Sequence, residues 1–287
     1  MNIHYFWYSR RCCRPLAVLT SKVWHSLQFS AGAQSLYCNN LFAINMSEDI
    51  IAEKEVSQDI QTLIGLLQLS DSFFPSGMYT MSNGLESYFY RKKVRNANQL
   101  HDLIKVYLEQ QIGPSDCNAL GNSYVALENH DIQRLIEVDQ TIFAMRIVEE
   151  VRNASTRSGM QVLRCISSFV TDHAMLLPYQ EAIKQGKASG IYPVSLAIAA
   201  NAFGISKHNA GIILLYGFII SMAGAALRLG ILHHYDAQRI IHELKPIISD
   251  TVIKNINRPL SGIWQFCPDI DINQMKHEKM HSKMFIT

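Results

Sequence analysis

One run of seventeen residues without a charged side chain, Gly211–Leu227 ("GIILLYGFIISMAGAAL"), restricts what this chain can fold into. A helix that is apolar on every side must be buried, either in a membrane or at the centre of a large helical bundle. The run is at the lower limit of bilayer-spanning length, contains three glycines, a serine and a tyrosine, and is closed by Arg228. We therefore interpret it as a buried core helix, with a membrane anchor through residues 211–227 as the alternative.

The rest of the chain after residue 58 also shows helical spacing of apolar residues. In "QDIQTLIGLLQL", for example, Ile60, Leu63, Ile64 and Leu67 share one face. Further helices are expected after a cap at Asn98, between about Val138 and Val170 with an interruption at "RNASTRSG", from Tyr192-Pro193, from Ser206 or Lys207 to Leu229, after a cap at Asp236, and from Pro246. No stretch shows the period-2 alternation of a strand. The sequence predicts an all-α fold, a single helical-bundle domain of about ten helices.

Residues 1–47 differ in composition from the rest of the chain. They contain Arg10, Arg11, Arg14 and Lys22 but no acidic residue, and they are rich in Ser, Cys and aromatic side chains. Three interpretations compete: a targeting segment, a signal peptide without a clean apolar core, and an upstream extension before a start at Met46. We favour the last. We expect a disordered extension at 1–47 and one domain at 48–287, with a partner-docking tail at about 268–287.

Charge and cysteine content argue against two classes of function. The formal net charge is only +2, and the part of the chain after residue 47 is close to neutral, so no nucleic-acid partner is expected. The six cysteines contain no C-x-x-C pair, which argues against a structural zinc site of the usual spacing. They stand at positions 12, 13, 38, 117, 165 and 267. Isolated cysteines of this kind are typical of reduced thiols in a cytoplasmic protein.

The stretch "LSDSFFPSGMYTMSNGLE", Leu69–Glu86, is rich in hydroxyl groups and glycines and invites a catalytic interpretation. A phosphate-binding loop would need a lysine after its second glycine, and Leu85 follows Gly84 instead. A nucleophile elbow would need Gly-x-Ser-x-Gly after a strand, and neither is present. The pattern favours a turn with Pro75 and Gly77, in which Asp71 or Ser72 bonds nearby amides.

The sharpest literal motif is "HEKMH" at His277–His281, which matches the H-E-x-x-H pattern of zinc hydrolases. Such a site needs a third ligand, but Met284 and Thr287 stand where the extended motif has glycine and histidine. A zinc-dependent hydrolase using His277, Glu278 and His281 is therefore kept only as an alternative. His234, Gln238 and His242 share one helical face, which we interpret as an exposed surface rather than a ligand set.

Four blocks, in order and at matching spacing over residues 58–287, carry a resemblance to a known family. They are "LLQLSDSFFPSGMYTMSNGLE", "RNASTRSGMQVL", "AALRLGILHHYDAQRII" and "CPDIDINQMKHEKMHSKMFIT". The chain resembles the urease accessory protein UreF family. The matching positions, which the resemblance marks as partner-binding, are Pro75, Gly77, Ser82, Gly84, Glu86, Arg152, Ser155, Arg157, Gly159, Gln161, Arg228, Gln238, His277, Glu278, Lys283, Met284 and Phe285. Met78 replaces a frequent second glycine, and Lys283-Met284-Phe285-Ile286-Thr287 replaces a terminal Arg-Leu-Phe-x-Ser.

The resemblance implies an all-α, homodimeric, cytoplasmic accessory protein with no catalytic activity, resident metal or cofactor. It implies binding to a UreD-type protein (also called UreH), recruitment of the GTPase UreG with regulation of its GTP hydrolysis, and action on apo-urease during nickel insertion. It also implies that the C-terminal tail docks into the UreD-type partner. Because a short polar tail cannot fold alone, we expect it to become ordered on a partner, with Met280, Met284 and Phe285 as anchors.

Overall fold

The structure is a computed structural model that describes residues 56–287. The chain divides into two units, Met1–Gln61 and Thr62–Thr287. The helical fold is that of the second unit. The predicted extension at 1–47 and the three cysteines at positions 12, 13 and 38 lie outside the described residues.

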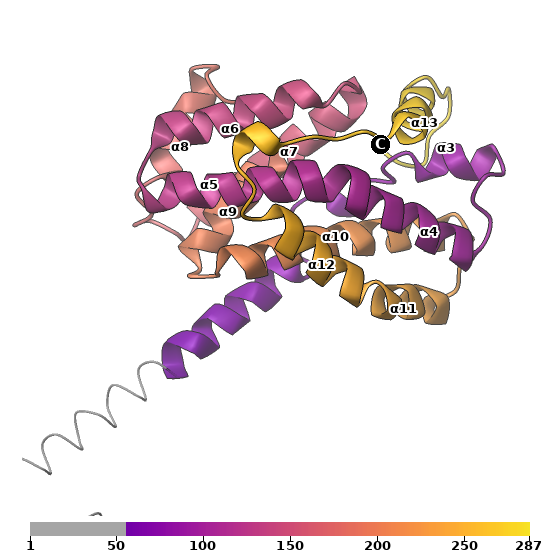
Figure 1. Ribbon diagram of the computed structural model, residues 1–287, viewed down its shortest axis with the longest axis horizontal. Helices are drawn as coiled ribbons and strands as arrows, with labels where there is room; N and C mark the ends of the chain where they lie inside the picture. Colours follow the sequence, from indigo (N-terminus) through magenta and orange to yellow (C-terminus); the bar gives the residue numbers. More distant parts are fainter. Residues whose placement is uncertain (1–55) are drawn as a thin grey trace, which may run out of the picture. The chain divides into compact units, whose positions relative to one another are not determined.

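The prediction of an all-α fold with about ten helices is confirmed, because every regular element of the described residues is helical (Figure 1). A helix runs through residues 56–70. The elements that follow are η3 (Met78–Thr80), α3 (Leu85–Tyr90), α4 (Ala97–Tyr107), the π-helical η4 (Leu108–Cys117), α5 (Asn118–Glu128), α6 (Ile132–Met145), α7 (Glu149–Ser167), α8 (Leu176–Lys184), α9 (Tyr192–Ala202), α10 (Lys207–Arg228), α11 (His234–Glu243), α12 (Lys245–Asn255), η5 (Leu260–Gly262) and α13 (Pro268–Glu278).

Helices α9 and α10 form the centre of the fold. All residues of α9 from Tyr192 to Ala200 are buried, and α5, α7 and α10 pack around this helix. Helix α10 is the only helix among residues 56–287 that is long and apolar enough to cross a membrane, but 67% of its most apolar window is buried inside the fold. Burial against α9, α12 and η4 accounts for its apolar composition, as the sequence predicted.

Close backbone contacts in this core depend on glycine. Helix α4, η4 and α5 form one continuous helical run that packs against α12 and contains Pro114 in its π-helical part. A Cβ atom at Gly121 of α5 would lie 1.9 Å from the carbonyl oxygen of Ile256, just after α12. Any larger residue at Gly121 would therefore push the two helices apart.

Several predicted helix boundaries are wrong by a few residues. The cap of α4 is Asn96, not Asn98: Asn96 has an extended backbone, and its side chain accepts a hydrogen bond from the amide of Gln99. The cap of α11 is His233, and Asp236 is the third residue of the helix, where its carboxylate accepts from the amide of His233. Helix α10 begins at Lys207 with Ser206 as its cap, which agrees with the start predicted at Ser206 or Lys207.

The interruption expected at "RNASTRSG" lies earlier, at residues 146–148 between α6 and α7. The segment itself is helical, within α7, and its small side chains face α9. In a sequence, a run rich in Ser, Thr and Gly is typical of a loop. Here a neighbouring helix approaches so closely that small residues are required, and tertiary packing outweighs local propensity.

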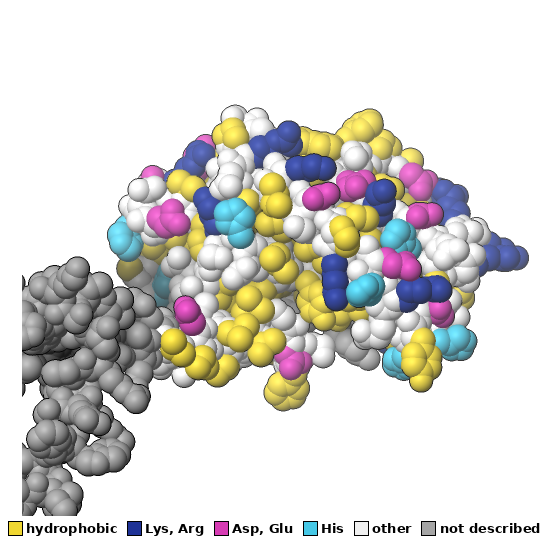
Figure 2. All heavy atoms as spheres, turned by 60° about the horizontal axis from the view of Figure 1, so that its bottom comes forward, with side chains coloured by type: hydrophobic (Ala, Val, Ile, Leu, Met, Phe, Trp, Pro, Cys, Tyr) yellow, Lys and Arg dark blue, Asp and Glu magenta, His cyan; other side chains and the backbone are white. Residues whose placement is uncertain are grey.

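The apolar face of the first helix is exposed. Ile60, Leu63, Ile64 and Leu67 are each 50–59% exposed, although the helix itself forms as predicted. On the face drawn in Figure 2, apolar, basic, acidic and histidine side chains are interspersed, and neither charge sign forms a continuous field there.

Candidate partner-docking site

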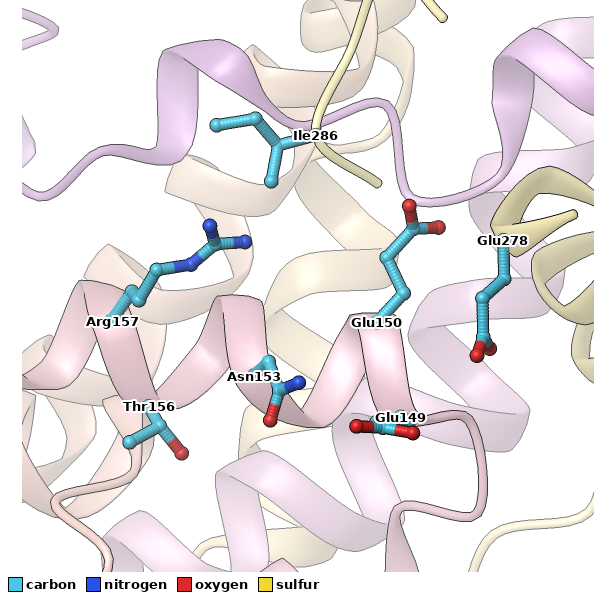
Figure 3. A pocket seen from close by; sticks show the side chains of 7 residues that line it. All are labelled: Glu149, Glu150, Asn153, Thr156, Arg157, Glu278 and Ile286. Atoms are coloured by element: carbon cyan, nitrogen blue, oxygen red, sulfur yellow. The ribbon is translucent and has the colours of Figure 1, made fainter. Parts of the chain in front are cut away.

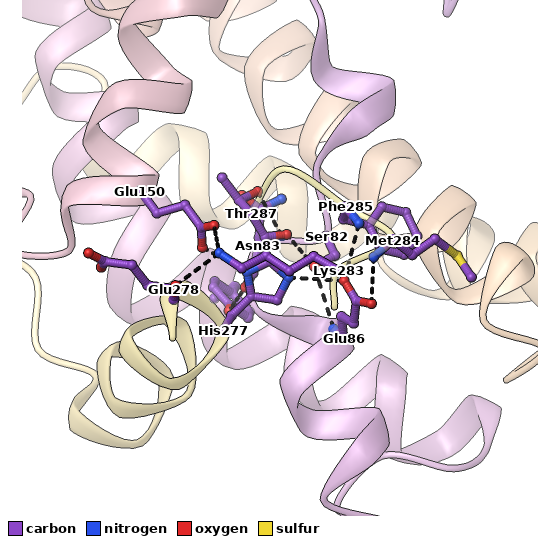
Figure 4. A network of polar contacts seen from close by, with 11 residues as sticks. Ser82, Asn83, Glu86, Glu150, His277, Glu278, Lys283, Met284, Phe285 and Thr287 are labelled. Atoms are coloured by element: carbon purple, nitrogen blue, oxygen red, sulfur yellow. Dashed lines mark hydrogen bonds and ion pairs between the residues drawn. The ribbon is translucent and has the colours of Figure 1, made fainter. Parts of the chain in front are cut away.

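Residues 268–278 of the predicted docking segment form α13, and we call the residues that follow, 279–287, the tail. The tail packs onto the body of the same chain, and Glu86 of α3 is the main point of attachment. The side chain of Glu86 is buried, and its carboxylate accepts hydrogen bonds from the amides of Met284 (2.8 Å) and Phe285 (3.2 Å). Glu86 Oε2 also lies 3.0 Å from Nε2 of His277 in α13 (Figure 4). One buried carboxylate therefore holds both α13 and the tail.

His277 lies between two carboxylates. Its Nδ1 is 2.7 Å from Oε2 of Glu150 in α7, while its Nε2 faces Glu86. Lys283 of the tail donates to the other oxygen of Glu150 at 2.8 Å (Figure 4). A neutral imidazole carries one N–H, so both ring nitrogens can donate only when the ring is an imidazolium. We call Glu86, Glu150, His277 and Lys283 the latch.

The electrostatics of the latch favour its charged form. Burial lowers the pKa of His277, but the hydrogen bonds to Glu150 and Glu86 outweigh this effect, and the pKa is raised above its ordinary value. Burial raises the pKa of Glu150, but its bonds to His277 and Lys283 outweigh burial and lower it. Both shifts describe an imidazolium and a carboxylate that stabilise each other.

The end of the tail pairs with the segment before α3. The amide of Ile286 donates to the carbonyl of Thr80 at 2.9 Å, and the amide of Ser82 donates to the carbonyl of Thr287 at 2.8 Å. The hydroxyl of Ser82 donates to the same oxygen of Thr287. Side chains alternate along this segment, so that Phe285 and Thr287 point inward and Met284 and Ile286 point outward.

The interior position of Phe285 differs from what the sequence predicted. We expected this side chain to anchor the tail in a partner, but it is only 3% exposed and the guanidinium of Arg228 lies 4.5 Å from its ring centre. The assumption that a polar tail has no site on its own chain was wrong, because Glu86 and Ser82 supply one, and the role of Phe285 as a partner anchor stays a prediction. Met284, which is 59% exposed, stays accessible, and its role as a partner anchor stays a prediction.

The other family positions of the first block belong to the surface on which α13 and the tail pack. Gly77 and Gly84 have left-handed backbones, and a Cβ atom at Gly84 would lie 3.0 Å from the side chain of Gln274 in α13. Pro75 is exposed in the turn, where the carboxylate of Asp71 accepts from the amide of Phe73 as predicted. The first block therefore forms the surface on which the tail packs, and it is not a reactive loop.

The second block forms the part of α7 that contacts α9. A Cβ atom at Gly159 would lie 2.0 Å from the carbonyl oxygen of Gly190, and the hydroxyl of Ser155 accepts from the amide of Tyr192. Arg152 donates to the carbonyl of Arg146. Gln161 accepts from Arg164 nearby on the surface of α7. Most of this block thus serves packing, and its contribution to partner binding stays a prediction.

A groove of about 720 Å³ opens between α7 and the tail (Figure 3). One end carries the carboxylates of Glu149 and Glu278 and the other end carries the guanidinium of Arg157, all three on exposed residues. Ile286 of the tail, 41% exposed, lines the groove from above in this view. The remaining lining residues are Glu150, Asn153 and Thr156. The tail contributes Ile286 to the groove, while α7 and α13 supply the other lining residues.

The structure does not support the zinc alternative. Helix α13 ends at Glu278, so His277 and His281 do not lie one turn apart on one helix. Both nitrogens of His277 face carboxylates of the latch, while His281 is exposed. Residues 56–287 contain no group of three or more His, Cys, Asp or Glu side chains that could hold a metal ion. His234, Gln238 and His242 lie on the exposed face of α11.

Comparison with known proteins identifies the family. The family model UreF matches residues 94–245, just over half of the chain. The chain belongs to the UreF family. It is 32% identical to the urease accessory protein UreF of Trichodesmium erythraeum over 230 residues, covering 80% of this chain and 99% of that protein. The UreF proteins of a Bacillus species (28%; 78% and 99% covered) and of Actinobacillus pleuropneumoniae (27%; 77% and 97% covered) are also similar.

Membership in the UreF family makes this chain a urease accessory protein and not an enzyme. The sequence pointed to Glu86, His277 and Lys283 through the resemblance, but it did not point to Glu150. Glu150 lies two residues before Arg152, in a stretch of α7 that also carries Glu149 and has no distinctive pattern. Only the packing of α13 against α7 distinguishes the two glutamates, since Glu150 faces His277 and Glu149 faces the groove.

Proposed function

We propose that this chain is the scaffold of a urease maturation complex: it bridges a UreD/UreH-type protein and the GTPase UreG on apo-urease while nickel is inserted. The proposal includes a cytoplasmic location, a homodimer and regulation of GTP hydrolysis by UreG. Family membership supports the general role, because the similar proteins are named as urease accessory proteins. The more specific roles rest on the family resemblance and on the surface that the closed tail creates.

The closed tail is the observation that carries the proposal. It places two apolar side chains, Met284 and Ile286, on the surface, and Ile286 lines a groove with separated charges. Protein interfaces combine apolar anchors, particularly aromatic residues and Met, with a polar rim that sets orientation. Opposite charges at the two ends of one groove would orient a partner segment that carries a basic and an acidic side chain.

Co-purification tests the proposal. The full chain should be co-expressed with a UreD-type protein, UreG and apo-urease, and the nickel content of urease should be measured with and without this chain. We expect a complex that contains all four proteins, and low nickel content when the chain is omitted. Failure to recover the UreD-type protein or UreG with this chain would contradict the bridging role.

Variants of the groove locate the docking surface. The double variant Met284→Ser with Ile286→Ser removes both apolar anchors and retains the backbone hydrogen bonds of the tail. We expect about tenfold or greater loss of affinity for one partner, because buried interface anchors each contribute 1–2 kcal/mol or more. Exposed Leu177 of α8 is the control, since Leu177→Ser changes an apolar surface residue outside the groove. Equal binding by both variants would place the docking surface elsewhere.

The proposed regulation of UreG has a separate measurement. The rate of GTP hydrolysis by UreG should be compared in the presence of the wild-type chain and of the charge-reversal variant Arg157→Glu. Arg157 lies at the end of the groove opposite to Glu149 and Glu278 (Figure 3). If UreG docks in this groove, the variant should lose its effect on the hydrolysis rate. An unchanged rate with the wild-type chain would show that the chain recruits UreG without regulating it.

A further inference from the structure

The latch contains a buried histidine whose two ring nitrogens face two different carboxylates. His277 is fully buried, Glu86 is 1% exposed at its side chain, and Glu150 is 12% exposed. Each carboxylate comes from a different helix, α3 and α7, and both meet on one residue of α13.

The protonation state of His277 decides how many of these contacts can form. An imidazolium donates one hydrogen bond to each carboxylate. A neutral ring donates only one, and its other nitrogen then presents a lone pair to a carboxylate oxygen. At Glu86 this would leave a buried carboxylate without its cationic partner, which is a strongly destabilising situation. Because the same carboxylate binds the amides of Met284 and Phe285, the tail is directly coupled to the ring.

We propose that the latch is a proton-operated switch: it holds the tail closed while His277 is protonated and releases the tail when His277 loses its proton. Release would remove Ile286 from the groove and open the contacts of residues 284–287 with Thr80, Ser82 and Glu86. The tail would then be displaced while the core around α9 and α10, which contains no part of the latch, stays folded.

The charged groups around His277 come from three neighbouring elements, and they favour a protonated ring. From α3, Glu86 faces the ring. From α7, Glu150 faces the ring and Glu149 lies farther out in the groove. From the tail, Lys283 binds the outer oxygen of Glu150 and the carbonyl of Glu278. Lys283 therefore contacts the oxygen of Glu150 that His277 does not use, and both side chains that bond the ring are acidic.

The direction of the pH effect follows from the two shifts in pKa. The pKa of His277 is raised in the closed state. Protonated His277 therefore stabilises the closed tail fully below its pKa in the unfolded chain, about 6.5, and this stabilisation is lost as pH rises through its pKa in the folded chain. The pKa of Glu150 is lowered. Ionised Glu150 therefore stabilises the closed tail above its pKa in the unfolded chain, and this stabilisation is lost as pH falls through its pKa in the folded chain. The tail should therefore be closed at weakly acidic pH and should open as pH rises through the folded pKa of His277.

Hydrogen exchange of the tail tests the switch on the isolated full-length chain, so the result does not depend on any partner. Exchange of the amides in residues 283–287 should be measured by mass spectrometry between pH 6 and pH 9 and corrected for the intrinsic rate at each pH. We expect protection to fall with rising pH, with a midpoint above 6.5, while peptides from α9 and α10 keep their protection. A tail whose corrected protection is constant over this range would overturn the proposal.

Two neighbouring glutamates provide a matched pair of variants. Glu150→Gln removes one of the two charges beside His277, and we expect it to move the midpoint down by about one pH unit. Glu149→Gln makes the same change one residue away, where the side chain does not contact the ring, and should leave the midpoint in place. A similar shift in both variants would indicate a general charge effect and would contradict the switch.

A direct measurement on the ring covers the case in which a variant destabilises the tail. In protein labelled with ¹³C-histidine, the NMR shift of His277 should titrate with the same midpoint as tail protection in the wild-type chain. In His277→Gln the pH dependence of tail protection should disappear, whatever the remaining level of protection. Retention of the wild-type pH profile in this variant would overturn the assignment of His277 as the titrating group.

Discussion

Helix α10 and the C-terminal part of the chain are both buried, but they are buried by opposite means. Helix α10 has no charged residue between His208 and Arg228 and fills the centre of the bundle with Ile, Leu, Phe, Met and Ala. Helix α13 and the tail bury His277, Asn273, Gln274 and Thr287, and Glu86 opposite them, together with Ile270 and Phe285. The first region depends on apolar area, and the second depends on paired polar groups.

This difference has consequences for how each region can fail. Apolar burial is non-directional and varies little with pH, so α10 should be lost only when the whole core unfolds. A buried polar network is stable only while every member has its partner, because each unpaired charge is costly. The tail should therefore open as a separate, low-stability unit while α10 stays folded.

Glu86→Ala should have the largest local effect, because it removes the acceptor for two tail amides and one of the two partners of His277. Loss of one member of a buried charged pair costs about 3–5 kcal/mol, which is enough to release the tail. We expect hydrogen exchange to show an unprotected tail, while circular dichroism shows nearly unchanged helix content. Global unfolding of this variant would contradict the separation of the two regions, and Lys93→Ala, at an exposed ion pair with Asp269, is the control for a lost surface charge.

Leu215→Ala should also have a large effect, but on the stability of the whole core and not on the tail alone. Leu215 is fully buried in α10, and large-to-small changes in a core cost about 2–5 kcal/mol. We expect the free energy of unfolding, measured with urea, to fall by this amount in one cooperative transition. Leu177→Ala, at a 68% exposed position of α8, should change it by less than about 0.5 kcal/mol. Selective opening of the tail in Leu215→Ala would show that the two regions are not independent.

Arg228→Ala tests one contact between α10 and the tail. The guanidinium of Arg228 lies over the ring of Phe285, and a partly desolvated contact of this type contributes about 1 kcal/mol. Protection of the tail amides from hydrogen exchange should fall about fivefold, while the core keeps its protection. In a double-mutant cycle, Arg228→Ala should have no further effect on this protection once Phe285→Leu is present. A coupling energy near zero would mean that the stacked geometry contributes nothing to closure.

Lys283→Ala should have the smallest effect. The side chain of Lys283 is 26% exposed, and its ion pair with Glu150 lies at the edge of the latch. Exposed or partly exposed ion pairs contribute about 0.5 kcal/mol, and salt weakens them. We expect a slight loss of tail protection that disappears in about 0.5 M NaCl, and recovery in Lys283→Arg. An effect as large as that of Glu86→Ala would move the centre of the latch from Glu86 to Lys283.

The sequence was most informative where local rules and burial agree. The charge-free run predicted a central helix, the start of this helix was placed at Ser206 or Lys207, and Pro193 and Pro246 were placed near the starts of α9 and α12. Helix caps were missed where two candidates stood close together, as with Asn96 and Asn98, because the choice depends on backbone conformation and not on residue type. "RNASTRSG" was misjudged because its small residues reflect contact with α9.

By itself, the sequence determined the helical class, the buried position of α10 and the four blocks that mark the family, because these depend on local spacing and composition. Only the tertiary structure decided that the tail closes on its own chain and that Glu150, rather than Glu149, completes the site around His277. The three members of that site stand at positions 86, 150 and 277, on three different helices. No local pattern links residues so far apart, and a polar group can be buried at His277 only because α3 and α7 both place a carboxylate against it.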